Sequence, residues 1–187
     1  MEVAQSIITI SWLVFIGYWL ISARSVKETQ EVVGGIGGYW HWILIIIAFI
    51  IMNSPSVYPL TMQLYPFVQS LPFICDILVI LGLIIAIMAR KTLADNWSGS
   101  VTFKKNHELI TKGIYHYIRH PIYTGVLLMF LGSAILFDTV GALIGFVIIV
   151  VTFWLKLKQE EELMTKHFGK EYTKYKQQVK ALIPFIL

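Results

Sequence analysis

Charged residues are scarce in this chain, and cysteine is almost absent. Asp, Glu, Lys and Arg make up 14% of the 187 residues, while 57% are hydrophobic, compared with about half in a soluble domain. The single cysteine, Cys75, excludes an internal disulfide framework and any metal site that needs several cysteine ligands. Because the hydrophobic residues also come in long runs, we expect much of the chain to lie in lipid.

The hydrophobic residues form five blocks of nearly membrane-spanning length. They are roughly Ile7 to Ile21, Trp40 to Leu60, Leu71 to Ala89, Pro121 to Phe137, and Val140 to Leu155. A helix needs about 20 residues to cross a bilayer core of about 30 Å. Only a short polar interruption at Asp138 and Thr139 separates the last two blocks, so we expect a helical hairpin there. The sequence therefore predicts an all-α, multi-pass membrane protein with about five spans.

Basic residues occur only in every second connection between these blocks. All 15 Lys and Arg residues lie after the first block, after the third, or in the C-terminal segment. Cytoplasmic loops carry the excess of basic residues, so this alternation predicts five crossings with the N-terminus outside and the C-terminus in the cytoplasm. A net charge of +4 spread between apolar blocks fits lipid headgroups, and we expect no nucleic-acid partner.

The chain is predicted to be one membrane domain over residues 1–187, with three spans in residues 1–90 and the candidate functional site in residues 91–187. This second half consists of a polar loop, the helical hairpin and a C-terminal helix. From Lys158 to Tyr175 apolar residues recur at intervals of three and four, which predicts an amphipathic helix that lies against the membrane surface. The glycine-rich stretch from Gly34 to Gly38 follows an apolar block and no strand, so it predicts a flexible connection and no phosphate-binding loop.

The densest group of residues that could bind a ligand or take part in catalysis lies where the polar loop meets the fourth block. It reads Gly113-Ile-Tyr-His-Tyr-Ile-Arg-His-Pro-Ile-Tyr-Thr-Gly125. Its Arg and Tyr residues are also typical of a span that begins at the membrane interface. His116 and His120 have the spacing of a helical metal pair, but Pro121 disfavours helical geometry at His120, so we expect no metal. The alternative to a plain interfacial flank is a functional site, in which an arginine, a histidine and several aromatic residues meet a ligand at the membrane boundary.

An acidic cluster, Glu160 to Glu162, lies just after the fifth block among seven lysines. Such a cluster can be a solvated turn that pairs with neighbouring lysines. At the membrane depth of Arg119 and His120, its carboxylates could instead hold a cationic group or a ribose. Both interpretations are compatible with the sequence.

These motifs together resemble a known family. The pattern Gly113-x-Tyr115-x-x-x-Arg119-His120-Pro121-x-Tyr123-x-Gly125, followed by Glu160-Glu161, Phe168-Gly169-x-Glu171-Tyr172-x-x-Tyr175 and Ile183-Pro184, is similar to the isoprenylcysteine carboxyl methyltransferases and related phospholipid methyltransferases. The resemblance covers about the C-terminal half of the chain. The first three blocks contribute only compatible hydrophobicity.

The resemblance implies a cytoplasmic-side pocket for S-adenosylmethionine that is built without a Rossmann domain. The cofactor-binding residues it implies are His107, Leu109, Tyr115, His120, Pro121, Tyr123, Glu160 and Glu161. The C-terminal helix would cover the cofactor, and a lipophilic acceptor would enter from the bilayer. The chain departs from many relatives at Gln178, where they carry an arginine that is a candidate for contacting the acceptor carboxylate.

The resemblance further implies catalysis by Arg119, His120 and Glu161. If the acceptor is an isoprenylcysteine-like carboxylate, it is already nucleophilic, and Arg119 would orient it or stabilise the site. If the acceptor is a phospholipid or other lipid amine, His120 or Glu161 would remove a proton. The expected membrane is the cell membrane in a prokaryote and the endoplasmic reticulum in a eukaryote.

Two other functions are compatible with parts of the sequence. The Arg-His-Pro-x-Tyr motif also resembles sterol reductases, which would use NADPH. A non-enzymatic membrane scaffold would bind no cofactor. The Glu160-Glu161 pair favours a methyltransferase over a sterol reductase, and the spans hold too few polar residues for a transport pathway.

Overall fold

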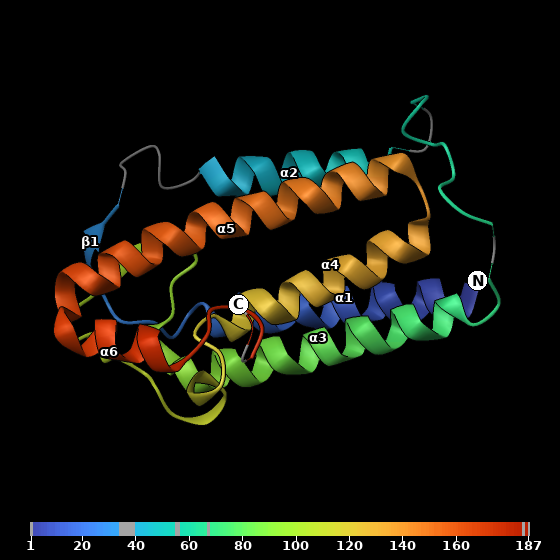
Figure 1. Ribbon diagram of the computed structural model, residues 1–187. Helices are drawn as coiled ribbons and strands as arrows, with labels where there is room; N and C mark the ends of the chain where they lie inside the picture. The colour runs from blue at the N-terminus through green and yellow to red at the C-terminus, as the bar shows by residue number, and fades with distance from the viewer. Residues whose placement is uncertain (1, 34–39, 55–56, 67, 185, 187) are drawn as a thin grey trace.

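Five long helices run side by side along the molecule in the computed structural model (Figure 1), which describes residues 2–33, 40–54, 57–66, 68–184 and 186. The helices are α1 (Glu2–Ser22), α2 (Trp40–Met52), α3 (Leu71–Leu93), α4 (Pro121–Phe137), α5 (Val140–Phe168) and the short α6 (Lys170–Gln178). The connection predicted from Gly34 to Gly38 lies outside the described residues. The predicted helical class is thus observed, and the order of the apolar blocks is the order of the five long helices.

Three helical segments are long and apolar enough to cross a membrane: α1, the segment Leu71–Asn96 that continues α3 by one 3₁₀ turn, and α5. The helices Trp40–Met52 and Pro121–Phe137 are apolar but shorter. The prediction that the second block is helical as far as Leu60 was wrong, because α2 ends at Met52. The side chains of Asn53 and Ser54 donate to the carbonyls of Phe49 and Ile50, at 2.9 and 2.7 Å, and such bonds compete with continued helix.

The helices form two groups, with α2 beside α5, and α1 and α4 beside α3 (Figure 1). Glycines allow α3 and α4 to approach closely. A Cβ atom added at Gly125 would lie 2.7 Å from the backbone nitrogen of Ala86, and one at Gly132 would lie 2.8 Å from the carbonyl oxygen of Cys75. Small residues at such contacts are typical of helix packing in membranes, where van der Waals contact replaces the hydrophobic effect.

The predicted hairpin between α4 and α5 is confirmed. Asp138 ends α4 in the left-handed conformation, with φ of 51°, and its Oδ1 accepts hydrogen bonds from the backbone N–H groups of Leu64 and Tyr65. Thr139 caps α5, because its side chain accepts a hydrogen bond from Ala142 N at 3.1 Å. The hairpin returns the chain to the end of the molecule at which α4 begins.

The predicted separate helix from Lys158 to Tyr175 was wrong in its boundaries. No Gly or Pro interrupts the chain between Gly145 and Gly169, so α5 continues as one helix of 29 residues from the apolar block through the acidic cluster to Phe168. At Gly169, with φ of 53°, the chain reverses into α6. The acidic cluster is therefore held on a rigid helix.

A small antiparallel ladder, which the all-α prediction lacked, joins the two halves of the chain. Strand β1 (Thr29–Val32) pairs with β2 (Thr102–Lys104). Two 3₁₀ helices, η2 (Ala94–Asn96) and η3 (Gly113–His116), complete the segment between α3 and α4. The ladder fixes the segment after α3 against the segment after α1.

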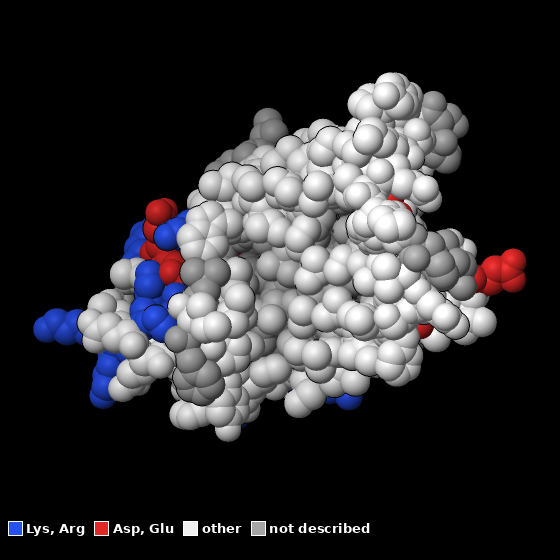
Figure 2. All heavy atoms as spheres, turned by 45° about the vertical axis from the view of Figure 1, so that its right-hand side comes forward, with Lys and Arg blue, Asp and Glu red and all other residues white. Residues whose placement is uncertain are grey.

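The surface divides into an apolar body and one end that is rich in Lys and Arg. Lys and Arg side chains gather at the end that carries β1 and α6, as Figure 2 shows for one face. Large apolar side chains on the helices are exposed, among them Leu13 at 63%, Ile43 at 59% and Phe73 at 70%. A soluble protein would bury such a surface, so these faces are suited to lipid.

Candidate active site

The motif from Gly113 to Gly125 forms a short 3₁₀ helix, an extended turn and the start of α4. Pro121 occupies the first turn of α4, where its missing N–H costs nothing, and His120 is the N-cap residue. The backbone N–H groups of Arg119 and His120 donate to the carbonyls of Lys180 and Ala181 at 2.8 and 2.9 Å. The segment after α6 therefore holds the backbone of this motif in place.

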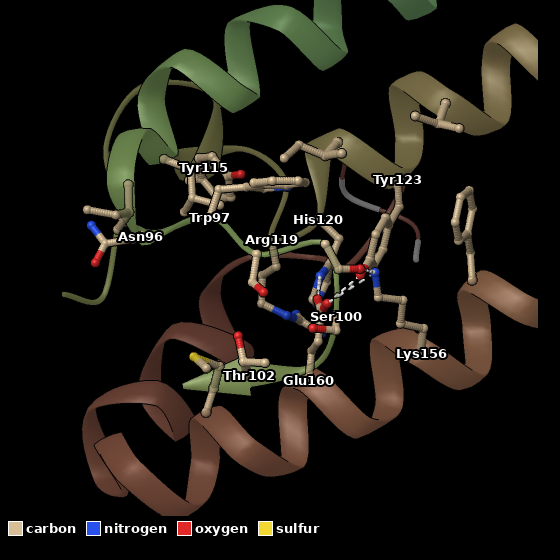
Figure 3. Close-up of a pocket in the computed structure, with 18 of the residues that line it drawn as sticks. Asn96, Trp97, Ser100, Thr102, Tyr115, Arg119, His120, Tyr123, Lys156 and Glu160 are labelled. Atoms are coloured by element: carbon tan, nitrogen blue, oxygen red, sulfur yellow. Dashed lines mark hydrogen bonds and ion pairs between the residues drawn. The ribbon is translucent and has the colours of Figure 1, made fainter. Parts of the chain in front are cut away.

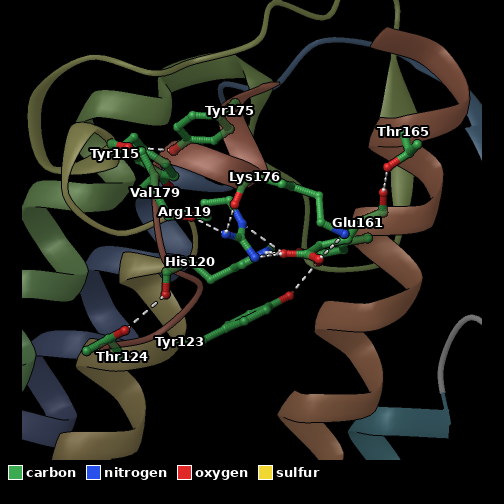
Figure 4. Close-up of polar contacts among 11 residues, drawn as sticks. Tyr115, Arg119, His120, Tyr123, Thr124, Glu161, Thr165, Tyr175, Lys176 and Val179 are labelled. Carbon is green, nitrogen blue, oxygen red and sulfur yellow. Dashed lines mark hydrogen bonds and ion pairs between the residues drawn. The ribbon is translucent and has the colours of Figure 1, made fainter. Parts of the chain in front are cut away.

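Three side chains surround Glu161 of α5 in an ion cluster: Arg119 and His120, which directly precede α4, and Lys176 of α6 (Figure 4). Arg119 donates to Glu161 Oε1 from Nε at 2.9 Å and from Nη2 at 2.7 Å, and Lys176 Nζ lies 2.7 Å from Oε2. His120 Nε2 lies 3.3 Å from Oε1. The Glu161 side chain is only 6% exposed, so these contacts satisfy a buried carboxylate and tie the three helices together.

The neighbouring Glu160 faces a different environment. Its Oε1 accepts a hydrogen bond from the Tyr123 hydroxyl at 2.5 Å, and its Oε2 lies 3.7 Å from His120 Nδ1. The Tyr123 ring stacks between those of His120 and Phe153, with centroid distances of 5.5 and 5.0 Å. Glu160 thus presents a carboxylate beside a column of aromatic rings (Figure 3).

A cavity of about 270 Å³ lies against this column, close to the lower end of the range for small-molecule sites, about 300–1,000 Å³. One part of its lining is apolar and comes from the long helices: Trp12, Phe15, Trp19, Trp42, Ile45, Val126, Phe130 and Phe153. The other part is polar and comes from the segment after α3, from the motif and from α5: Asn96, Ser98, Ser100, Thr102, Arg119, His120, Lys156 and Glu160. The cavity therefore joins a lipid-like environment to a polar one.

Most residues predicted to bind the cofactor line this cavity. They are His107, Leu109, Tyr115, His120, Tyr123 and Glu160, and Arg119 lines it too. Pro121 and Glu161 are not among the lining residues, because Pro121 is buried in the first turn of α4 and Glu161 is enclosed by the ion cluster. Gln178, the departure noted above, is the exposed last residue of α6.

His107 is held against the ladder by stacking and one hydrogen bond. Its ring stacks on Phe103, with centroids 4.9 Å apart, and its Nδ1 accepts a hydrogen bond from Lys104 N at 3.3 Å. Burial, aided by the charges of Lys27 and Lys104, lowers the pKa of His107 to about 4. The imidazole is therefore neutral at pH 7, and because its Nδ1 already accepts from Lys104 N, the N–H of Nε2 is the group that it can offer in the cavity wall.

Two of the tyrosines that line the cavity, Tyr115 and Tyr175, contact each other. The Tyr175 hydroxyl of α6 donates to the carbonyl of Tyr115 at 2.5 Å (Figure 4), and burial raises the pKa of both phenols. Glu31 of β1 contacts Lys166 and His167 near the end of α5, and these hydrogen bonds lower the pKa of Glu31. Ladder, α5 and α6 thus support one another around the cavity.

Several lining residues were missed in the sequence. Trp12, Phe15 and Trp19 lie in the first block, whose aromatic residues are indistinguishable from lipid-facing ones until α1 is packed. His41 and Lys156 are 1% and 5% exposed, although histidine is commonly only partly buried and lysine is normally exposed. The spacing of Lys156 four residues before Glu160 was a usable signal, since it places both on one face of a helix.

Comparisons with known proteins agree with this architecture. The phospholipid methyltransferase family matches residues 72–171. Protein-S-isoprenylcysteine O-methyltransferase B of Arabidopsis thaliana is 29% identical over 112 residues, which are 58% of this chain and 57% of the relative. The Xenopus laevis protein-S-isoprenylcysteine O-methyltransferase is 28% identical over 141 residues, 72% of this chain and 49% of the relative.

A solved structure is also similar. It is that of a eukaryotic intramembrane Ras methyltransferase, isoprenylcysteine carboxyl methyltransferase, with a TM-score of 0.56 and 26% identity, covering 79% of this chain and 50% of that chain. The apolar helices and this likeness define an integral membrane protein. The chain belongs to the phospholipid methyltransferase family, whose match covers more than half of it. It spans about half the length of the relatives described above.

Proposed function

We propose that this protein is a membrane-embedded methyltransferase that uses S-adenosylmethionine to esterify the carboxylate of an isoprenylcysteine-like acceptor. The observation that carries the proposal is the cavity itself, which joins aromatic side chains of the long helices to the Arg119-His120 motif and Glu160. The names of the relatives support carboxyl methylation in particular. Family membership favours methyl transfer over nicotinamide-dependent reduction and over a scaffold.

The polar part of the cavity suits a sulfonium cofactor. Glu160 supplies a negative charge, and the Tyr123 hydroxyl that donates to it holds its carboxylate in place. Neutral His107 and the side chain of Asn96 offer hydrogen-bonding groups without adding positive charge. We propose that these residues, with Leu109 and Tyr115, hold the cofactor.

S-adenosylmethionine supplies a methyl group whose transfer forms one O–C bond at the acceptor and breaks one C–S bond, with the electron pair left on sulfur. A carboxylate acceptor has no proton to lose, so the chain needs no general base for this reaction. Its residues act by alignment and by excluding water. The ion cluster of Glu161, Arg119, His120 and Lys176 positions α4, α5 and α6 around the cavity, and the stacked rings of His120, Tyr123 and Phe153 close one side of it.

Lipid amines are the second candidate acceptors, because the matched family is described as phospholipid methyltransferases. An amine must lose a proton to accept a methyl group, and His120 is the candidate base, since it lines the cavity with its Nδ1 3.7 Å from Glu160.

We further propose that residues 1–187 act as one membrane domain with the charged end in the cytoplasm. The topology would place the N-terminus outside and let α2 and α4 cross with local thinning of the bilayer. The gathering of Lys and Arg at one end supports this orientation. The acceptor would then reach the cavity from the bilayer, in the cell membrane of a prokaryote or the endoplasmic reticulum of a eukaryote.

Transfer of labelled methyl from S-adenosylmethionine tests the proposal directly. The purified protein is incubated with labelled cofactor and with membrane extract or a farnesylcysteine probe, and the product is treated with base. We expect a base-labile ester. A base-stable product would assign the reaction to an amine or a thiol, and the absence of transfer with binding of NADPH would refute methyl transfer.

A further inference from the structure

A buried lysine lies on the cavity wall between its apolar and polar parts. Lys156 is 5% exposed and lines the cavity, and Figure 3 shows its side chain directed toward Tyr123 and Glu160. Phe153, Lys156 and Glu160 follow one another at intervals of three and four residues, so they share one face of α5. Along this face the cavity wall changes from aromatic to cationic to anionic.

The ammonium group of Lys156 has unused hydrogen-bonding capacity. Its Nζ donates to the carbonyl of Gly99 at 2.8 Å and forms an ion pair with Glu160, whose Oε1 lies at 3.9 Å, beyond hydrogen-bond distance. It also lies 5.5 Å from the centroid of the Tyr123 ring. An ammonium group has three donors, so two remain without an acceptor among the described residues. A buried ammonium group with free donors is stabilised by a ligand that accepts hydrogen bonds, and an anionic group does so most strongly.

The position of the ammonium group is fixed by its surroundings. His41, which is 1% exposed at the start of α2, places its Nε2 3.2 Å from the same Gly99 carbonyl. The loop residue Gly99 is thereby held between α2 and α5. A fixed donor can select one position of a ligand group, which a mobile surface lysine cannot do.

Arg119, the other cation of the cavity wall, is already engaged. Its Nε and Nη2 donate to Glu161, and its Nη1 donates to the carbonyls of Lys176 and Val179. Arg119 therefore holds the site together, whereas Lys156 keeps donors for a ligand.

We propose that Lys156 is the specificity-determining residue that binds the anionic group of the methyl acceptor, and that it selects carboxylates over amines. This inference rests on the proposed methyltransferase function. A lipid chain would lie among the aromatic residues near Phe153, and the methyl donor would lie beside Glu160. The acceptor group must lie between these two, which is the position of Lys156 on α5. Its charge attracts a carboxylate and repels a protonated amine.

Ligand affinity can be measured without methyl transfer, because Trp12, Trp19, Trp42 and Trp97 line the cavity and their fluorescence reports occupancy. The probes are N-acetyl-S-farnesylcysteine and its uncharged carboxamide, bound to the detergent-purified full chain. We expect the wild type to prefer the acid. Lys156→Met removes this preference and weakens acid binding roughly ten- to a hundredfold, as expected for a lost charged hydrogen bond. Lys156→Arg retains the preference.

Lys158→Met is the matched control, because Lys158 is an exposed lysine on the same helix, with its Nζ 4.9 Å from the centroid of the Trp154 ring. We expect it to leave both affinities unchanged. A wild type without preference for the acid overturns the inference with no variant needed, and so does an unchanged preference in a folded Lys156→Met protein. Acid preference without methyl transfer in the wild type would refute only the proposed function.

Discussion

Replacing Glu161 by glutamine tests the view that this residue stabilises the site and that Glu160 faces the ligand. The Glu161 carboxylate is enclosed by Arg119, Lys176 and His120, and its side chain is 6% exposed. Glutamine has nearly the same shape but carries no charge and offers one acceptor oxygen. Glu161→Gln therefore leaves Arg119, whose side chain is 10% exposed, without its counter-ion.

The expected loss of stability follows from the burial of this ion pair. Removing one partner of a buried pair costs about 3–5 kcal/mol, because the remaining charge is left uncompensated. Lys176 is 38% exposed and can turn to water, so the lower limit of about 3 kcal/mol is the appropriate value. For a chain of this size that corresponds to a fall in Tm of roughly 6–12 °C.

Thermal unfolding of the detergent-purified variant, followed by circular dichroism, measures this loss. Glu162→Gln is the matched control, since Glu162 is the exposed neighbour on the same helix, and its Tm is expected to change by less than about 2 °C. Equal Tm values for Glu161→Gln and the wild type would refute the reasoning. A Glu161→Gln protein of normal stability that lost all cofactor affinity would instead assign Glu161 to the ligand site.

Three further predictions concern the cofactor wall, the ladder and the helix packing. Tyr123→Phe removes the hydroxyl that donates to Glu160 and is expected to weaken S-adenosylmethionine binding about tenfold in calorimetry. Tyr117→Phe, at an exposed tyrosine, is expected to leave this affinity unchanged, and equal affinities of Tyr123→Phe and the wild type would contradict the role of Tyr123. The pKa of His107 is about 4 when folded and 6.5 ordinarily, so the unfolded chain binds the proton more readily and stability falls as pH drops from 6.5 toward 4. His107→Gln should reduce the fall in Tm between pH 7 and pH 4.5, and an unchanged profile would exclude His107 as its source. Gly125→Leu inserts a side chain where α3 and α4 touch and should prevent folding, judged by gel filtration. Gly17→Leu should be tolerated, because no atom lies within 4 Å of the added Cβ, and a well-folded Gly125→Leu protein would contradict the packing of α3 on α4.

Features that depend on near neighbours in the chain were predictable. Pro72 and Pro121 lie in the first turns of α3 and α4, and the polar pair at Asp138 and Thr139 ends one helix and caps the next. Proline geometry and capping act within a few residues, so sequence spacing reports them directly. The meeting of Arg119 with the acidic cluster followed from the hairpin, because the hairpin returns the chain to the same end of the molecule.

Features that depend on which surfaces meet were not predictable. The β1–β2 ladder pairs residues about 70 positions apart, and neither strand has a strong alternating pattern. The apolar aromatic residues of α1 can face lipid or the cavity with equal hydropathy, and only their packing against α4 decides between these. Lys156 is buried by the docking of α5 on α2 and on the loop at Gly99, which no local pattern encodes.

By itself, the sequence determined that much of the protein lies in lipid, in which order its helices follow one another, and that Lys and Arg gather at one end. Hydropathy and the distribution of Lys and Arg are properties of the chain before it packs. Only the tertiary structure decided which carboxylate serves which purpose. Glu160 and Glu161 are adjacent and chemically identical, but successive residues on a helix point about 100° apart. The docking of α5 therefore turns Glu160 toward the cavity and Glu161 toward Arg119 and Lys176.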